Sequence, residues 1–153
     1  MNNAPLPRID VTPTWARFNE ELIKLVDFVP GDRLDWSPKP ELWNFRGILL
    51  HMASARDIWL ERDVQDGVEA PDVYRTVRTR PEIQQALRRT WERLAAFLHD
   101  QAKLDATYAT PWETNVSGHW IAFHALEHDI HHRADILHYL ALLGIETPDV
   151  STP

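Results

Sequence analysis

Apolar residues recur at helical spacing in four segments of the chain. In the first, from about Pro13 to Val29, large apolar side chains follow one another three or four positions apart, which is the spacing of one helix face. Thr12 suits the N-cap of this helix, and Pro13 suits its first helical position. The second segment runs from about Phe45 to Asp66, behind Asn44 as its capping residue.

The third segment follows Thr79-Arg-Pro-Glu82, which has the form of a capping box. The fourth starts near Ser117 or Gly118 and runs to about Leu143, with Gly144 as a stop signal. No strand pattern of comparable strength accompanies these four helices, so we predict an all-α four-helix bundle. Connections of about 12 residues are long for a simple up-down bundle, which leaves room for a pocket cover or a crossover.

Length and composition limit the number of domains, the partners and the kinds of metal ligand that the chain can have. We predict one domain over residues 1–153, with loosely ordered tails at 1–11 and 146–153. A net charge of -7 argues against nucleic acid as a partner. No apolar run approaches a membrane span and no signal peptide is recognisable, so we expect a cytoplasmic protein without membrane contact. Cysteine is absent, so nitrogen and oxygen atoms must hold any metal.

Histidine is concentrated in the fourth helix. Five of the eight histidines lie between residues 124 and 138, and His124, His128 and His132 are spaced by four. This spacing stacks them on one helix stripe. Two imidazoles one turn apart can share a divalent metal, whereas the first and third are roughly 12 Å apart along the axis. The pair is therefore either His124/His128 or His128/His132, and a third ligand must come from another helix.

His51 is the leading candidate for that third ligand. It lies on the inward face of the second helix, facing the histidine stripe, although a hydrogen-bonded core role is the alternative. His99 falls off the apolar stripe of its helix near the C-terminus, where a solvated imidazole is expected.

Further side chains lie near the histidines or in the connections. His131, His124, Glu127 and Asp135 are candidates to support a metal ligand, and Asp135 points close enough to the His128 direction to orient an imidazole. In the connections, the candidates are three tryptophans that either pin a loop or line a pocket: Trp36, Trp43 and Trp112.

Two segments resemble a known family. Residues 127–148, Glu-His-Asp-Ile-His-His-Arg-Ala-Asp-Ile-Leu-His-Tyr-Leu-Ala-Leu-Leu-Gly-Ile-Glu-Thr-Pro, are similar to the last-helix signature of DinB-like (DinB/YfiT-type) proteins. Residues 47–56, Gly-Ile-Leu-Leu-His-Met-Ala-Ser-Ala-Arg, resemble the family's first ligand motif. The resemblance implies a four-helix bundle with a divalent metal on His51, His128 and His132. Ala134 and Asp135 stand where the family often has Gly-Gln, so any role of that amide is not carried over.

Three histidine ligands leave one to three coordination positions for water or substrate, the arrangement of a catalytic site. The resemblance implies a metal-dependent enzyme, and specifically a transferase that uses a low-molecular-weight thiol such as mycothiol or bacillithiol. A metal-dependent hydrolase and a non-catalytic metal- or ligand-binding bundle are the alternatives. We expect zinc or nickel first, with iron, manganese or cobalt behind them. No general base stands out, so the catalytic residues stay unassigned.

A homodimer is implied by the resemblance for some members. It also agrees with the amount of apolar surface on the fourth helix, which includes Trp120, Ile121 and Tyr139. A purely structural dimer, whose histidines no longer bind metal, is the last alternative. The small-molecule substrate cannot be named from these patterns.

Overall fold

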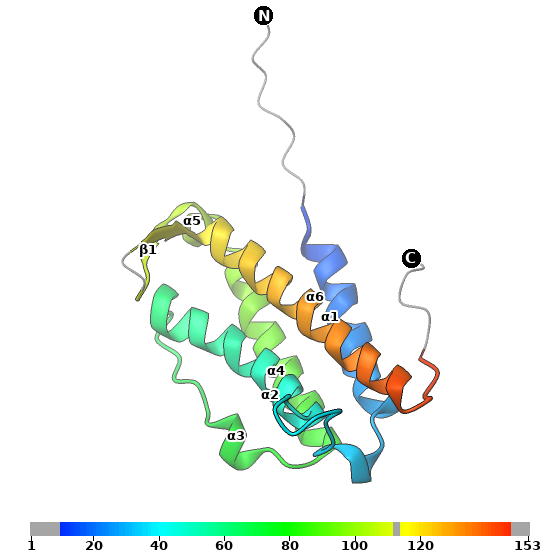
Figure 1. Ribbon diagram of the computed structural model, residues 1–153. Coiled ribbons are helices and arrows are strands. Elements are labelled where there is room, and N and C mark those ends of the chain that lie inside the picture. Colours follow the sequence, from blue (N-terminus) through cyan, green and yellow to red (C-terminus); the bar gives the residue numbers. More distant parts are fainter. Residues whose placement is uncertain (1–9, 112–113, 148–153) are drawn as a thin grey trace, which may run out of the picture.

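Four long helices lie side by side in the computed structural model, which describes residues 10–111 and 114–147 (Figure 1). They are α1 (Thr12–Leu25), α2 (Phe45–Ile58), α4 (Arg80–Leu98) and α6 (Gly118–Leu142). Helix α2 packs against both α4 and α6, and α4 also packs against α1. The predicted all-α four-helix bundle is confirmed.

Short elements fill the connections. They are η1 (Val26–Phe28), η2 (Gly31–Arg33), α3 (Val73–Thr76), α5 (Gln101–Asp105), β1 (Thr107–Ala109) and β2 (Asn115–Ser117). The two strands form an antiparallel hairpin in which Tyr108 pairs with Val116. Strands of this length contain too few residues for a period-two pattern, which is why the sequence did not predict the hairpin.

Side chains cap three of the four long helices. Asn44 accepts a hydrogen bond from the Gly47 amide at 2.7 Å, Thr79 and Glu82 form the predicted capping box, and Ser117 accepts from the amide three residues on. The predicted cap of the first helix was wrong by one position. Thr12 already lies within α1, whose N-cap, Val11, offers no side-chain acceptor.

The sequence predicted one continuous helix from about Phe45 to Asp66. The structure shows instead a helix that is interrupted. Helix α2 ends at Ile58 and passes directly into a π-helical segment, η3 (Trp59–Val64). This segment ends at Gln65, which adopts a left-handed conformation with φ 54°. Wide π turns interrupt the regular 3.6-residue repeat and often accompany functional sites, but the hydrophobic pattern does not distinguish them from α-helix.

Two groups of apolar residues form the core. The larger joins α1, α2, α4 and the C-terminal half of α6, and the smaller gathers around Trp15, Trp59 and Leu94. Among the described residues, no helix is both long and apolar enough to span a membrane. Most of the two predicted tails, as well as Trp112, lies outside the described residues.

Candidate metal centre

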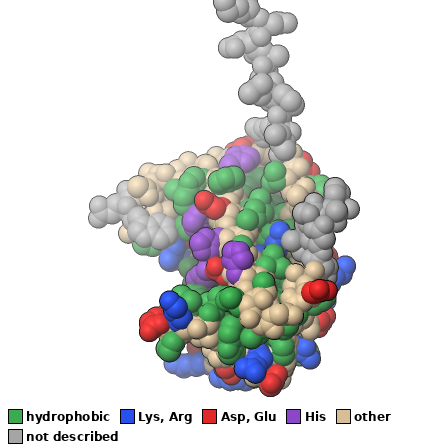
Figure 2. Space-filling model, turned by 45° about the vertical axis from the view of Figure 1, so that its right-hand side comes forward, with side chains coloured by type: hydrophobic (Ala, Val, Ile, Leu, Met, Phe, Trp, Pro, Cys, Tyr) green, Lys and Arg blue, Asp and Glu red, His purple; other side chains and the backbone are tan. Residues whose placement is uncertain are grey.

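Three histidines from two helices meet on one side of the bundle. His51 projects from α2, and His128 and His132 project from successive turns of α6. The Nε2 atoms of His51 and His128 are 2.8 Å apart, and each of the three residues has a ring nitrogen within 4.8 Å of those of the other two. Figure 2 shows histidine side chains gathered on this face among hydrophobic ones. The structure thus brings together the three residues that the sequence selected.

The local sequence explains this convergence. The Asn44 cap fixes where α2 begins, and His51 follows two turns later on the face that packs against α6. The spacing of His128 and His132 places both imidazoles on one stripe of α6. All three side chains are half-buried, so they lie at the edge of the core and can still be reached by a small molecule.

The environment disfavours a positive charge on two of the three imidazoles. Burial, and after it the neighbouring His128 and His132, lower the pKa of His51 to about 4. Burial and His128 also lower the pKa of His132, against the opposing effect of Asp135. Neutral imidazoles offer the lone pairs that a metal ion needs.

The lowered His51 pKa predicts an acid-sensitive fold for the metal-free protein. Between the ordinary histidine pKa of 6.5 and about 4, the unfolded chain binds a proton that the folded protein does not, so the free energy of unfolding falls as the pH falls. We expect the urea midpoint to decrease through this window, and to decrease less in His51→Gln. An equal pH dependence in the two proteins, measured by circular dichroism, would contradict this assignment.

The donor set fits a divalent transition metal. Two nitrogens that share a tetrahedral zinc lie roughly 3.4 Å apart, given zinc–nitrogen bonds of about 2.1 Å. The observed 2.8 Å between His51 and His128 needs only a small rotation of the side chains to reach that separation. Neutral imidazole is a ligand that zinc and nickel both accept, so the residues present fit such an ion.

Asp135 lies beside the triad, where the sequence suggested that it could orient a ligand imidazole. Its Oδ2 is 3.1 Å from Nδ1 of His132. The exposed His131 approaches the same carboxylate with its Nε2 at 3.8 Å. Asp135 is therefore placed to hold the His132 ring, and His131 lies outside the triad.

His124 and Glu127 lie one turn away from the triad. The His124 ring stacks on Trp120, with centroids 4.8 Å apart and planes 7° apart, and it also contacts Trp59. Glu127 is exposed, with a carboxylate oxygen 3.7 Å from His124 Nδ1. These two candidates form a separate aromatic and ionic contact.

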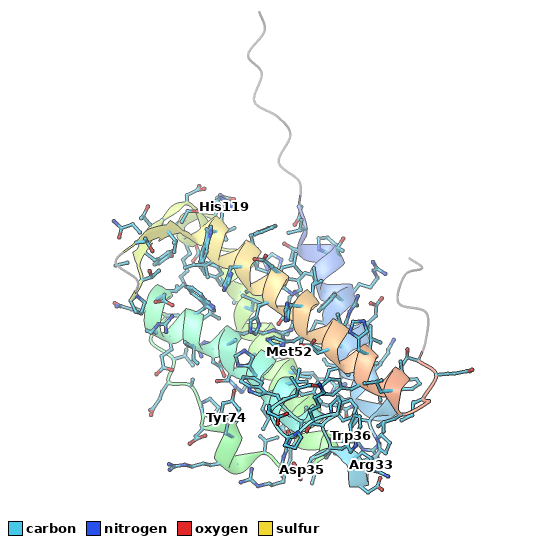
Figure 3. The ribbon with its side chains drawn as sticks, in the orientation of Figure 1. Arg33, Asp35, Trp36, Met52, Tyr74 and His119 are labelled. Carbon is cyan, nitrogen blue, oxygen red and sulfur yellow. The ribbon has the colours of Figure 1, made fainter. Side chains whose placement is uncertain are left out.

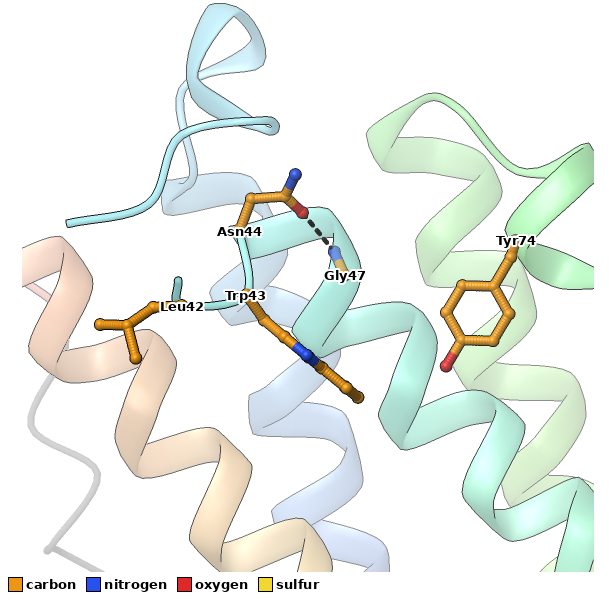
Figure 4. Close-up of a pocket in the computed structure, with 5 residues that line it drawn as sticks. All are labelled: Leu42, Trp43, Asn44, Gly47 and Tyr74. Carbon is orange, nitrogen blue, oxygen red and sulfur yellow. Dashed lines mark hydrogen bonds between the residues drawn. The ribbon is translucent and has the colours of Figure 1, made fainter. Parts of the chain in front are cut away.

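Trp43 connects the triad to a pocket. Its ring meets the His51 ring edge-on at a centroid distance of 4.4 Å and lies parallel to the His132 ring at 6.2 Å. The pocket, of about 350 Å³, is lined by Leu42, Trp43, Asn44, Gly47 and Tyr74 (Figure 4). None of the described residues that line it is charged, so its walls suit a neutral, partly apolar group.

Trp36 has a different role from Trp43. Its ring lies 5.9 Å, between centroids, from the rings of both Phe45 and Tyr139, and it packs against the larger core group. Figure 3 shows Trp36 and Tyr74 at separate places around α2, with His119 at the far end of α6. Trp36 thus pins its loop to the core.

Sequence reasoning missed one residue of the pocket and one residue next to the triad. Tyr74 lies in the short helix α3, which carries no periodic pattern, and only the fold brings it to the pocket. Asp129, fully buried directly after His128, was also missed. Its place at a core position of the predicted fourth helix could have revealed it, because a buried carboxylate needs a charged or hydrogen-bonding partner.

Comparisons with known proteins agree with this architecture. A DinB-like protein from Bacillus subtilis has a TM-score of 0.70 and 16% identity, covering 90% of this chain and 93% of that one. A DinB-like protein from Bacillus cereus gives 0.73 and 16%, with the same coverage. A structure described as a DinB family member from Exiguobacterium sibiricum gives 0.70 and 19%, covering 95% of this chain and 98% of that one.

At these identities the solved structures show a shared fold alone, and no curated protein matches the chain significantly. The sequence model of the DinB family, in contrast, matches residues 3–153, almost the whole chain. The match includes both helices that carry the three converging histidines. The chain therefore belongs to the DinB family.

Proposed function

We propose that this protein is a divalent-metal-dependent enzyme whose metal is held by His51, His128 and His132. One observation carries the proposal: three half-buried imidazoles converge beside a pocket with aromatic walls. A closed structural site uses four protein ligands, whereas three leave room for a reacting molecule. The metal is expected to be zinc or nickel.

We further propose that the reaction transfers a low-molecular-weight thiol to a small acceptor. A metal in this site would supply Lewis acidity, which lowers the pKa of a thiol or water that binds to it. The chain has no cysteine, so the thiol must be a co-substrate. The three histidines hold and orient the reacting group, and Trp43 with the neutral walls of the pocket contacts the acceptor.

The carboxylates near the triad favour a thiol over water as the nucleophile. Asp135 faces His132, and Asp129 is fully buried against Arg56, so neither is placed to accept a proton from an attacking water. A thiol has an ordinary pKa of about 8.5, much lower than that of water, so a thiol held by these histidines through a metal would depend less on such a base. Hydrolysis is the second candidate, because the same Lewis acidity also serves water.

A homodimer remains our expectation for the assembly. Of the three residues of α6 that suggested it, Ile121 and Tyr139 proved to be buried in the core, and only Trp120 is exposed, at 42%. Helix α6 also exposes Phe123 and Ile130, which are 66% and 49% accessible. Light scattering on the purified protein measures the mass directly, and a monomer at micromolar concentration would contradict this expectation.

The test of the proposed reaction uses untagged wild-type protein. Its metal content is measured by plasma mass spectrometry, and turnover is then assayed with mycothiol or bacillithiol and a panel of neutral electrophilic acceptors. We expect close to one metal per chain, thiol-dependent turnover, and loss of turnover on chelation with recovery on adding metal back. Turnover without thiol would favour the hydrolase. A protein that takes up neither zinc, nickel, iron, manganese nor cobalt would exclude both enzymes.

Removing the Trp43 side chain should impair acceptor binding. We expect Trp43→Ala to raise KM for the acceptor about tenfold, the range for losing a well-packed aromatic contact, while metal content stays near that of the wild type. Trp120→Ala is the matched control, because Trp120 is similarly exposed but contacts His124. An equal change in KM in the two variants would argue against a role of the pocket in binding.

A further inference from the structure

A buried ion pair lies directly behind the triad. Asp129, which follows His128 in α6, is fully buried and pairs with Arg56 of α2, itself 1% exposed. The Asp129 Oδ2 atom lies 3.0 Å from Arg56 Nε and 2.8 Å from Nη2, and it also receives the Trp15 indole N–H at 3.4 Å. One oxygen of this carboxylate thus takes all of these contacts.

The other oxygen of the same carboxylate is left for His128. Asp129 Oδ1 is buried and accepts no hydrogen bond from the described residues. It faces His128 Nδ1 across 4.0 Å. The second ring nitrogen of His128, Nε2, points to His51. The imidazole therefore has His51 at one ring nitrogen and a buried, unsatisfied carboxylate oxygen near the other.

From this geometry we propose that Asp129 is the positioning residue of His128. The inference rests on the proposed metal site and extends it. Metal-bound histidines commonly donate their free N–H to a carboxylate, which fixes the tautomer and ring orientation and makes the ligand more basic. If His128 Nδ1 and Asp129 Oδ1 move slightly closer than 4.0 Å, His128 gains such a partner. The same hydrogen bond gives Asp129 Oδ1 a donor, without which its burial is costly.

The surroundings of Arg56 keep this carboxylate in place. Arg56 Nη1 donates to Asn19 of α1 at 2.9 Å, and to the Leu87 carbonyl and the Thr90 hydroxyl of α4 at 3.3 and 3.4 Å. Three long helices, α1, α2 and α4, thus contribute to the group that holds Asp129, and the fourth, α6, carries Asp129 itself. The position of one metal ligand is thereby tied to the packing of the whole bundle.

Asp129→Asn tests the proposal against a matched control, Asp57→Asn. Asp57 is also 1% exposed and salt-bridged, but its partners are Arg89 and Arg93. Zinc affinity is measured by chelator competition, well below the unfolding midpoint of each protein. We expect Asp129→Asn to bind zinc about 10 to 100 times more weakly, and Asp57→Asn to stay within about twofold of wild type. Equal affinities in the two variants would overturn the proposal.

Nitrogen-15 NMR of the histidine rings gives a readout that a merely structural role would not move. In the wild type, metal-free as well as zinc-loaded, we expect a protected proton on His128 Nδ1. In the metal-free protein this tautomer makes His51 the donor of the 2.8 Å hydrogen bond between the Nε2 atoms. Asp129→Asn should lose the protection, and Asp57→Asn should keep it. A proton on His128 Nε2 in the wild type would refute the assignment.

The two proposals fail separately. If the wild type binds no metal, the metal centre is refuted, while a protected Nδ1 proton still supports Asp129 as the group that orients His128. If Asp129→Asn does not fold, Arg56→Lys replaces it, because lysine keeps the charge but not the planar fork that fixes the carboxylate. Weaker zinc binding in Arg56→Lys supports the proposal, and wild-type affinity contradicts it.

Discussion

Replacing His128 with alanine is expected to yield a folded protein without metal. The imidazole contacts both other members of the triad, with ring centroids 4.7 Å from His51 and 4.5 Å from His132. Its loss leaves two nitrogens, which cannot retain a transition metal against a chelator with the affinity of three. Plasma mass spectrometry should find less than about a tenth of the wild-type metal, with unchanged helical circular dichroism.

His131→Ala is the matched control for that experiment. His131 is on the same helix, and its side chain is 71% exposed and turned to Asp135. We expect its metal content to equal that of the wild type. Equal retention of metal by His128→Ala and His131→Ala would mean that the triad is not the ligand set, and the second cluster, His131 with His132 and Asp135, would then be tested.

Gly118→Ala should produce the largest loss of stability. Gly118 begins α6, and a Cβ atom there would lie 2.2 Å from the Lys103 carbonyl oxygen and 2.7 Å from Leu104 Cα. Both are backbone atoms, so no side-chain rotation relieves the overlap, and α5 must move away from α6. We expect a loss of roughly 3 kcal/mol or more in the free energy of unfolding, measured by urea denaturation.

Gly31→Ala controls for the general effect of adding a methyl group. A Cβ atom at Gly31 meets nothing within 4 Å, and its backbone does not need the left-handed region. The expected change is within about 0.5 kcal/mol. If both variants unfold at the same urea concentration, the contact between α5 and α6 is not the tight one described above.

The parts of the fold that follow local rules were predictable from sequence. The Asn44 cap, the Thr79–Glu82 capping box and the stop near Gly144 each depend on a few neighbouring residues, and so the four long helices emerged almost complete. The histidine spacing limited the two ligands from the fourth helix to His124/His128 or His128/His132. The family resemblance then selected His128 and His132 over His124.

Features that depend on tertiary contacts were not predictable. The π-helical turns after Ile58 carry the same apolar spacing as an α-helix, and the hairpin strands are too short to show a pattern. Helix angles placed Asp135 near the histidine stripe, but they could not say which imidazole its carboxylate reaches; that is His132. Tyr74 and Arg56 meet the site only because helices distant in sequence pack together.

Near the start of α2, residues whose sequence is constrained by hydrogen bonds lie next to residues that are free to change in evolution. Leu34 and Trp36 are bonded through their carbonyls to the first amides of α2, and the Asn44 cap completes that unit. Residues 39–42 lie outside it, exposed, and end in a wall of the pocket. Substitutions or length changes in this short stretch can thus change substrate preference without moving His51 along the axis of α2. Paralogues of this protein are expected to diverge there first, and loop exchange at 39–42 is the natural route to a new specificity.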